Sequence, residues 1–431
     1  YYDEVYNARA TSGSQSGTIN INNKDTGNIS VYGIYAPSKL HNAAAANGQK
    51  QSAEASGTIK ITDTNSLADI YGMYGTDTAN IYNSFAYNNS DGGLSNPTNS
   101  NATAVIDITK SETGHGTITG ISGSGFIYNA YANTDNGSAA NVSSNAEIKI
   151  TNNGSGDVIG ILQNGTDKKV NNALAFMNSA LSNATATGKI SVSGNGMVYG
   201  IKSNSTVANS ETQFNQSFNK TGDFSSEGII NVEGKSDVGA AYGIHLGENG
   251  ESKQEVYNAM GYNSTGTINV SNTQGGSAYG IYSQASTYTD KDSDNNAVIV
   301  YNNVYNAFRS SQKYGGDNVA AVGNIEVSST GRSSNLQSLV GAYSAGNMFN
   351  AYANSGADVK LESIGNITVN DNSTTLNMVV RGIESDGVTI ANAYNMGQNK
   401  NTDTNVVGNI TVNVNGTKSG TVGEAAGIYT K

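Results

Sequence analysis

Apolar and polar positions alternate in short segments that return along the whole chain. In each segment two β-branched residues flank one residue that is usually polar, as in GTINI (17–21), GTINV (266–270) and GNITV (365–369). A period of two with β-branched residues on one face is typical of a half-buried strand. Gly or Ala usually precedes the segment and turn-forming residues follow it. Because the ten copies lie far apart in sequence, we expect them to stack as parallel strands.

A glycine follows each of these strands at a matching place. It has an apolar residue two positions before it and usually another one position after it. Three steps along a straight strand change sides, so these two apolar residues share a face only if the backbone bends, and Gly reaches φ > 0 without a Cβ clash. The mean period is about 44 residues, which is typical of solenoids and arrays. The series is Gly33, Gly72, Gly120, Gly160, Gly200, Gly243, Gly280, Gly341, Gly382 and Gly427.

An asparagine marks a third element in each repeat. It is preceded two positions earlier by an apolar residue, with Gln213 as the exception, and is mostly followed by Ala. Two interpretations stay open: the Asn forms a second corner in the left-handed region, or its amides stack inward as a ladder. The series is Asn7, Asn42, Asn83, Asn129, Asn172, Asn215, Asn258, Asn306, Asn350 and Asn392.

Three strands and two bends in each repeat predict an all-β fold, a right-handed parallel β-helix (β-solenoid) of ten repeats. We expect residues 1–431 to form a single β-helical repeat domain. If one repeat makes one rung, the rod is about 48 Å long, and if it makes two, the length doubles. A β-propeller is the alternative, because its blades have a similar period.

Composition narrows the class of protein. Apolar residues make up 36% and charged residues 13%, with 25 Tyr and no Cys. The formal charge of −11 argues against nucleic acid as a partner. No apolar run approaches the length of a transmembrane segment. The start YYDEVYNA has neither Met nor a leader, which suggests a mature or excised piece, and a Cys-free acidic chain suits a bacterial exported protein.

Several segments resemble the passenger domains of bacterial autotransporters (type V secretion). They include GNISVYGIYA (27–36), VYNAMGYNSTGTINV (256–270), GSAYGIYS (276–283) and FNAYANS (349–355). In that family a C-terminal barrel carries an exported β-helix to the cell surface. The resemblance implies an extracellular location, at the bacterial cell surface (the cell outer membrane) or secreted. It also implies adhesion, self-association or, in some members, a grafted enzyme or toxin.

The sequence does not predict an enzyme. His41, His115 and His245 stand far apart in non-equivalent positions, so we expect surface or turn residues. No GxSxG, HExxH, GxxxxGK[ST] or CxxC motif occurs. Asp107 and Glu147 are read as equivalent outward positions, near enough for a carboxylate pair. Their neighbours Lys60 and Lys149 favour a solvated face of the sheet instead.

One acidic segment is a candidate metal site. Asp290, Asp292 and Asp294 have the spacing by which alternating carboxylates bind one hard cation, so calcium is the cofactor that the sequence suggests. Asn295 replaces the Gly of a calcium loop, and Tyr301 stands where a bidentate Glu would close it. A solvated acidic loop is the simpler interpretation, and no other cofactor is predicted.

Aromatic residues usually precede the repeat Asn. Stacking of equivalent rings along the solenoid is the favoured interpretation, and an exposed stripe that binds glycan rings is the alternative. The pattern assigns this position to Tyr6, Tyr82, Tyr128, Phe214, Tyr257, Tyr305 and Phe349.

The predicted function is that of a non-catalytic adhesin acting in adhesion or cell–cell association. Its partners would be host or bacterial surface ligands, glycans among them, with self-association as a further expectation. A self-assembling filament or surface-layer protein is the alternative, followed by a carbohydrate-active enzyme. We expect contacts at the longest insertions, 283–303 and 308–322, which hold Arg309, Lys313, Gly315 and Gly316. A lesser insertion, 86–104, surrounds Asp91, Gly92, Gly93 and Pro97.

Overall fold

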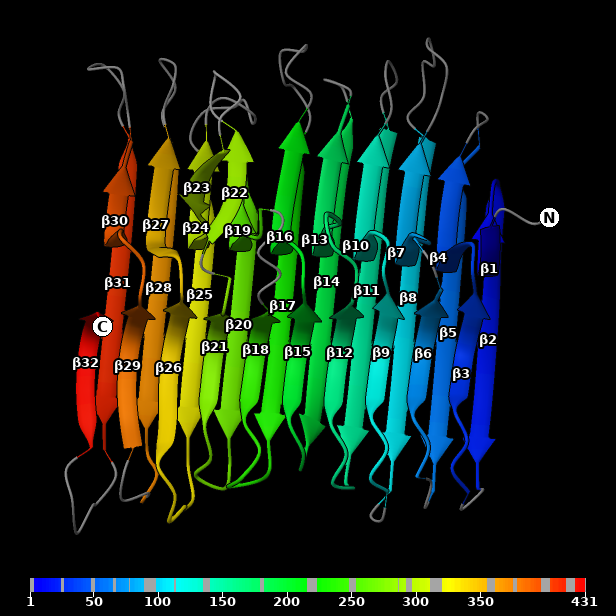
Figure 1. Ribbon diagram of the computed structural model, residues 1–431. Coiled ribbons are helices and arrows are strands. Elements are labelled where there is room, and N and C mark those ends of the chain that lie inside the picture. Colours follow the sequence, from blue (N-terminus) through cyan, green and yellow to red (C-terminus); the bar gives the residue numbers. More distant parts are fainter. Residues whose placement is uncertain are drawn as a thin grey trace.

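The protein is an all-β solenoid, and Figure 1 shows its rungs following one another in a row from the N-terminus to the C-terminus. No helix long and apolar enough to cross a membrane occurs among the described residues. The computed structural model describes residues 4–24, 27–47, 51–64, 67–76, 78–88, 98–111, 114–134, 140–178, 182–214, 223–247, 253–285, 287–291, 297–310, 320–354, 361–374, 378–396, 404–415 and 423–430.

Three ten-stranded sheets, A, B and C, form the solenoid. Sheet A contains β1 (Glu4–Ala10), β4 (Lys39–Asn47), β7 (Ile81–Asn88), β10 (Ile127–Thr134), β13 (Val170–Met177), β16 (Val207–Phe214), β19 (Val256–Met260), β24 (Asn303–Ser310), β27 (Asn347–Asn354) and β30 (Ile390–Asn395). Sheet B contains β2 (Gly13–Asn23), β5 (Ala53–Asp63), β8 (Thr98–Lys110), β11 (Ala140–Asn152), β14 (Asn183–Gly194), β17 (Phe224–Gly234), β20 (Ser264–Asn272), β25 (Ala320–Ser329), β28 (Glu362–Asp371) and β31 (Asn405–Val414). Sheet C contains β3 (Val31–Ala36), β6 (Ile70–Gly75), β9 (Ile118–Gly123), β12 (Val158–Gln163), β15 (Val198–Ser203), β18 (Ala241–Leu246), β21 (Ala278–Ser283), β26 (Gln337–Ser344), β29 (Met378–Ser385) and β32 (Glu424–Thr430).

Each repeat makes one rung with one strand in each sheet. All pairings between rungs are parallel, and the predicted apolar pairs stack in register, as Ile148 and Ile150 do on Ile190 and Val192. The parallel β-helix is therefore confirmed, and the open question of one or two rungs is answered as one. Ten rungs at strand spacing give a rod about 48 Å long.

The interior has two differently lined compartments. Between sheets B and C it is filled by stacked Ile and Val, Ile106, Ile148 and Ile190 among them, all 0% exposed. Between sheet A and the first half of sheet B it is lined mostly by Ala, such as Ala43 and Ala55. Small side chains let the two sheets approach closely, so the solenoid is thin at this end of the rung.

The repeat glycines of sheet C lie inside their strands. The predicted bend is present, because Val198 and Ile201, on either side of Gly200, are both buried. The strand pairing of β15 with β18 is also interrupted at Gly200. The expected cause is wrong, because none of the ten glycines has a positive φ. Glycine is needed for space, since a Cβ on Gly200 would lie 2.3 Å from Cγ2 of Ile230 and 2.5 Å from the carbonyl oxygen of Gly243.

The repeat asparagines form an inward ladder, not a left-handed corner. Each Nδ2 donates to Oδ1 of the Asn in the next rung at 2.8–3.0 Å. Eight of them also donate to the carbonyl of the Gly that lies two positions before the apolar pair of their own rung, as Asn209 does to Gly228 at 2.9 Å. The ladder thus ties sheet A to sheet B in every rung.

One member of the predicted Asn series is wrong. The sixth rung uses Asn209, which accepts from Asn172 and donates to Asn258, both at 2.9 Å. Asn215 lies outside the described residues, after the end of β16. With this shift Val207 occupies the position assigned to Gln213, and the apparent exception disappears.

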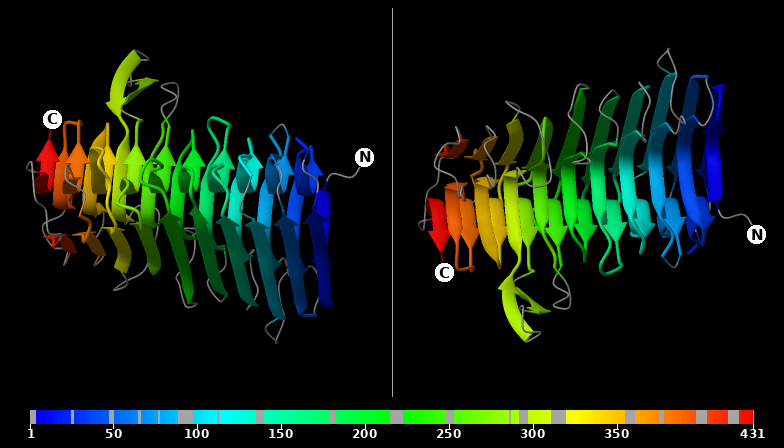
Figure 2. Two further views of the ribbon diagram at one scale, coloured as in Figure 1. Left: turned by 90° about the horizontal axis from the view of Figure 1, so that it is seen from below. Right: turned by 90° about the horizontal axis from the view of Figure 1, so that it is seen from above.

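Of the predicted insertions, only 283–303 forms strands outside the three sheets within the described part of the chain. Segment 283–303 contains an antiparallel hairpin of β22 (Thr287–Lys291) and β23 (Ala297–Tyr301), which stands out from the body in Figure 2. Arg309 does not project, because it lies in β24 and is 0% exposed. The described residues of segment 86–104 are the end of β7 and the start of β8. Lys313, Gly315 and Gly316, and likewise Asp91, Gly92, Gly93 and Pro97, lie outside the described residues.

Candidate functional site

The outer face of sheet A carries two columns of side chains that flank the Asn ladder. One column precedes the Asn and is aromatic, His41 included, in rungs 1–4 and 7–9. The other stands two residues after the Asn and is aromatic in rungs 3, 4 and 8–10. The first column is Tyr6, His41, Tyr82, Tyr128, Asn171, Ala208, Tyr257, Tyr305, Phe349 and Ala391. The second is Arg9, Ala44, Phe85, Tyr131, Leu174, Glu211, Met260, Phe308, Tyr352 and Tyr394.

Rings within the first column stack face to face. Tyr257 and Tyr305 have centroids 5.1 Å apart at 6°, and Tyr305 and Phe349 lie 5.2 Å apart at 13°. In rungs 8 and 9 the rings of the second column meet the first edge-on, as Phe308 meets Tyr305, whereas Tyr131 in rung 4 stacks with Tyr128. Each ring face is therefore largely covered by its neighbours. This arrangement favours the structural interpretation of the aromatic series over a platform that stacks on sugar rings.

The assignment of Phe214 to this aromatic series is wrong. Ala208 occupies the sixth-rung position, and Phe214 instead belongs to the inner cluster, where it lies 6.0 Å from Phe224. His41, in turn, is a member that sequence reasoning missed. It stacks between Tyr6, at 4.7 Å, and Tyr82, at 4.8 Å.

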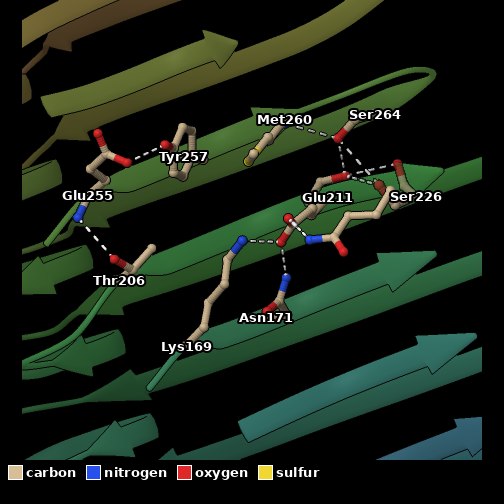
Figure 3. A network of polar contacts seen from close by, with 11 residues as sticks. Lys169, Asn171, Thr206, Glu211, Ser226, Glu255, Tyr257, Met260 and Ser264 are labelled. Carbon is tan, nitrogen blue, oxygen red and sulfur yellow. Dashed lines mark hydrogen bonds and ion pairs between the residues drawn. The ribbon is translucent and has the colours of Figure 1, made fainter. Parts of the chain in front are cut away.

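A polar cluster interrupts the aromatic columns in the fifth and sixth rungs (Figure 3). The carboxylate of Glu211 is fully buried and forms an ion pair with Lys169. It also accepts hydrogen bonds from Asn171 and, at 2.5 Å, from Gln213. Burial raises the pKa of Glu211, but Lys169 and these amides outweigh burial, and the net shift is downward. An ionised, fully coordinated carboxylate is a poor proton donor, so the cluster is suited to holding structure.

A second carboxylate lies on the same face in the seventh rung. Glu255 is 5% exposed, pairs with Lys253 at 2.9 Å and accepts from Asn303 at 3.0 Å and from the hydroxyl of Tyr257. Relative to the ladder Asn, Glu211 stands at +2 and Glu255 at −3. Five residues of strand span roughly 16 Å, well beyond the 5–9.5 Å that separates the two carboxylates of glycosidases.

Sheet C carries a similar aromatic face. Tyr199, Tyr242 and Tyr279 stack at 5.1 Å from ring to ring. His245 stands two residues after Gly243, edge-on to Tyr242 at 5.1 Å and stacked with Tyr282 at 5.4 Å. In its column His245 stands between Lys202 and Tyr282.

The structure brings none of the three histidines together. The expectation of a surface or turn residue is wrong for His41, which lies within β4 and is 3% exposed. His245 lies within β18 and is partly buried, so it is not a turn residue. Burial, with Lys39 and Arg9 nearby, lowers the pKa of His41 to about 3. Burial and Lys202 lower that of His245 to about 4. His115 is exposed, as expected, and contacts Ser155.

The other candidate residues can be placed only in part. Asp290 is exposed on β22 and accepts from the backbone N–H of Lys291 at 2.8 Å. Asp292 and Asp294 lie outside the described residues, and the part of the chain that is described holds no group of three metal-binding side chains. The pairing of Asp107 with Glu147 is wrong, because the register places Asp107 beside Lys149 and Glu147 beside Val105. Glu147 forms an ion pair with Lys189 at 3.0 Å.

The outer face of sheet B contains a shallow groove of about 390 Å³. It crosses β11, β14, β17, β20 and β25, a distance of about 19 Å at strand spacing. Core residues such as Val192 and Val232 contribute backbone atoms to the groove surface, because their side chains point inward. Two outward columns border it: Lys149, Ser191, Asn231, Asn269 and Glu326, and Thr151, Ser193, Glu233, Ser271 and Ser328.

The groove follows from side-chain size. Ser191, Ser193 and Ser271 are short, whereas Lys149 and Glu326 are long and stand at its ends. The hydroxyl of Ser193 is buried and has no hydrogen-bond partner among the described residues. Sequence reasoning missed this surface, although a run of short Ser and Asn in outward positions between charged ones was a usable signal.

Comparison with known proteins identifies no relative of this chain. No protein-family model, no curated protein and no solved structure matches the chain.

Proposed function

We propose that the protein is a non-catalytic adhesin of the bacterial surface or its surroundings, similar to an autotransporter passenger. It would act in adhesion or cell–cell association. The observation that carries the proposal is the polar groove on sheet B, whose hydroxyl and amide groups repeat at the rung spacing. An extended surface polymer, such as a glycan, would lie along it and make one set of weak contacts per rung. Many copies at a cell surface turn such contacts into avidity.

Groove chemistry supports binding more than cleavage. Its two glutamates, Glu233 and Glu326, stand two rungs apart and on opposite columns. Two rungs span about 10 Å along the axis, which exceeds the carboxylate separation of about 5 Å in retaining glycosidases and the upper value of about 9.5 Å in inverting ones. Glu233 is also paired with Lys235 at 3.5 Å, and Glu326 accepts from Asn370 at 3.3 Å.

The test is to fill the groove. Ser191→Tyr with Ser193→Tyr places two bulky neutral side chains on β14, within the groove. Thr411→Tyr with Asn413→Tyr places the same pair in the same two columns on β31, outside it. Binding of the immobilised chain to bacterial cells, host cells and a glycan panel should fall at least about tenfold for the first pair only.

Equal binding by the two double variants would contradict the groove as the contact surface. No binding by the wild-type chain to any of these surfaces would contradict adhesion. Release of reducing sugars from the panel, lost in Glu233→Gln, would instead support the carbohydrate-active class.

A self-assembling structural protein is the second candidate. It is favoured by the edges of the β22–β23 hairpin, which pair with no further strand among the described residues. Open-ended polymers that grow with concentration in sedimentation experiments would support this role. Discrete species of fixed size would contradict it.

A further inference from the structure

The hairpin of β22 and β23 projects from the solenoid with unprotected edges. Figure 2 shows it standing clear of the three sheets. Its two strands pair only with each other within the described part of the chain, so each has one unpaired edge. Two isolated strands are marginally stable in water. An unpaired edge is a template for a further strand, and natural proteins usually block such edges with charge, proline or a covering element.

Strand β23 has neither charge nor proline to block its edge, and no strand of the described chain covers it. Its sequence, Ala297–Tyr301 (AVIVY), holds no charged residue and no proline. Ile299 is 74% exposed and Tyr301 38%, on the same face of the hairpin as Ala297. High β-propensity with no charge is the composition that drives strands to pair between molecules. Strand β22, by contrast, carries Asp290 and Lys291.

The sequence of β23 is complementary to itself when it runs antiparallel. Centred on Ile299, an antiparallel pair places Ile299 against Ile299 and small Ala297 against large Tyr301. On the opposite face it places Val298 against Val300. Because β23 has no charged residue, no like charges meet across the two copies of this strand. The polar residues of β22 form the rim, as in protein interfaces.

We propose that β23 is a self-association edge, which pairs antiparallel with β23 of a second copy of this chain about a two-fold axis at Ile299. The product is a four-stranded sheet in the order β22, β23, β23, β22. A two-fold interface of this kind uses the same patch on both copies and closes at a dimer.

The affinity follows from the size of the patch. Two five-residue strands bury less than the about 1,200 Å² of a standard stable interface, so the dimer is weak in solution. Many copies on two facing surfaces would strengthen it. The pairing is a property of the purified chain and stands or falls separately from the groove on sheet B.

The first test compares two lysine variants by sedimentation over a wide concentration range. Ile299→Lys puts two positive charges opposite each other at the axis and should raise the dissociation constant at least about tenfold. Thr289→Lys adds the same charge at the residue paired with Ile299 within the hairpin, on β22, and should leave dimerisation intact. A wild-type chain that stays monomeric throughout, or a loss with Thr289→Lys alone, overturns the proposal.

The second test uses the absence of cysteine from the chain. Residues directly opposed across an antiparallel pair have Cα atoms about 4.5–5.5 Å apart, within the range of a disulfide. Ile299→Cys under mild oxidation should give a covalent dimer on a non-reducing gel, and Thr289→Cys should not. Circular dichroism melts confirm that each variant is folded, and equal crosslinking of the two, or none, overturns the proposed register.

Discussion

The side-chain amide of Asn172 donates to Oδ1 of Asn209, 2.9 Å away and one rung further along the solenoid. The two residues are 37 positions apart in sequence. This contact continues the ladder through the sixth repeat, where the sequence pattern predicts Asn215 in place of Asn209. It also shows that the amide is fully used, because Asn172 donates to Gly188 and Ile229 as well.

The ladder predicts a large difference between two neighbouring asparagines. Asn209→Ala removes the hydrogen bonds to Asn258, Gly228 and Thr267. It leaves the buried Oδ1 of Asn258 without its ladder donor and takes from Asn172 one of its three acceptors. Each buried polar group left unsatisfied costs about 1–3 kcal/mol, so we expect a loss of about 2–4 kcal/mol in the free energy of unfolding. Urea unfolding followed by far-UV circular dichroism measures it.

Asn215→Ala is the matched control, since it lies beyond the end of β16. It should change the midpoint of unfolding by much less than Asn209→Ala. The reverse order of the two effects would restore Asn215 to the ladder.

The repeat glycines predict a second contrast. Gly200→Ala brings a Cβ to 2.3 Å from Ile230, a contact that the packed core can relieve only by moving a strand. We expect a loss of about 3 kcal/mol or more in stability. Gly427→Ala meets nothing within 4 Å and should be nearly neutral. Thermal melts of the two variants compare them directly, and similar melting temperatures would contradict the steric explanation.

The sequence predicted the repeating core because each rung imposes the same constraint on one residue type. The ten repeat glycines of sheet C were found in this way, and at all of them except Gly427 an added Cβ would lie within 2.6 Å of a neighbouring atom. The sixth Asn was missed because Phe214–Asn215 imitates the aromatic–Asn pair of other repeats. Spacing was the better signal: nine residues separate Gly200 from Asn209, as they separate Gly33 from Asn42 and Gly120 from Asn129.

The surfaces were harder to predict. An outward strand position accepts almost any polar residue, so the groove emerges only when five distant strands are set side by side. Glu211 stands beside Asn171 and Lys169 only after the sixth repeat is placed correctly. The hairpin was expected as an insertion, but its antiparallel pairing depends on contacts between residues within that insertion.

The Lys169–Glu211 pair predicts a double-mutant cycle. Lys169→Met leaves a buried carboxylate without its cation and should cost about 3 kcal/mol of stability. Adding Glu211→Met removes the uncompensated charge and should recover part of the loss, because the neighbours in its column, Leu174 and Met260, are apolar. A deficit of about 1–3 kcal/mol should remain, because the amide of Asn171 loses its acceptor. Urea unfolding of the four proteins measures the coupling. Additive losses would mean that the pair does not act as a unit.

The buried histidines predict a loss of stability in mild acid. His41 has a pKa of about 3 in the folded chain and 6.5 when unfolded, so between these values the unfolded chain binds more protons. The contribution of His41 to the free energy of unfolding is therefore fully present above pH 6.5. It is lost as the pH drops, by at most about 1.4 kcal/mol per pH unit. His245 adds to the same window. Glu211, whose pKa is lowered, adds its own loss only below its unfolded value of 4.5.

Measurements between pH 7 and pH 5 thus isolate the histidines. His41→Tyr restores the residue type of the column and should reduce the pH dependence of the unfolding midpoint in this range, leaving the part that His245 contributes. His115→Gln changes an exposed histidine and should leave the slope of the wild type. Neither ring nitrogen of His41 has a hydrogen-bond partner among the described residues, so no contact offsets the burial of its charged form. An unchanged slope in His41→Tyr would show that the imidazole accepts its proton without leaving the stack between Tyr6 and Tyr82.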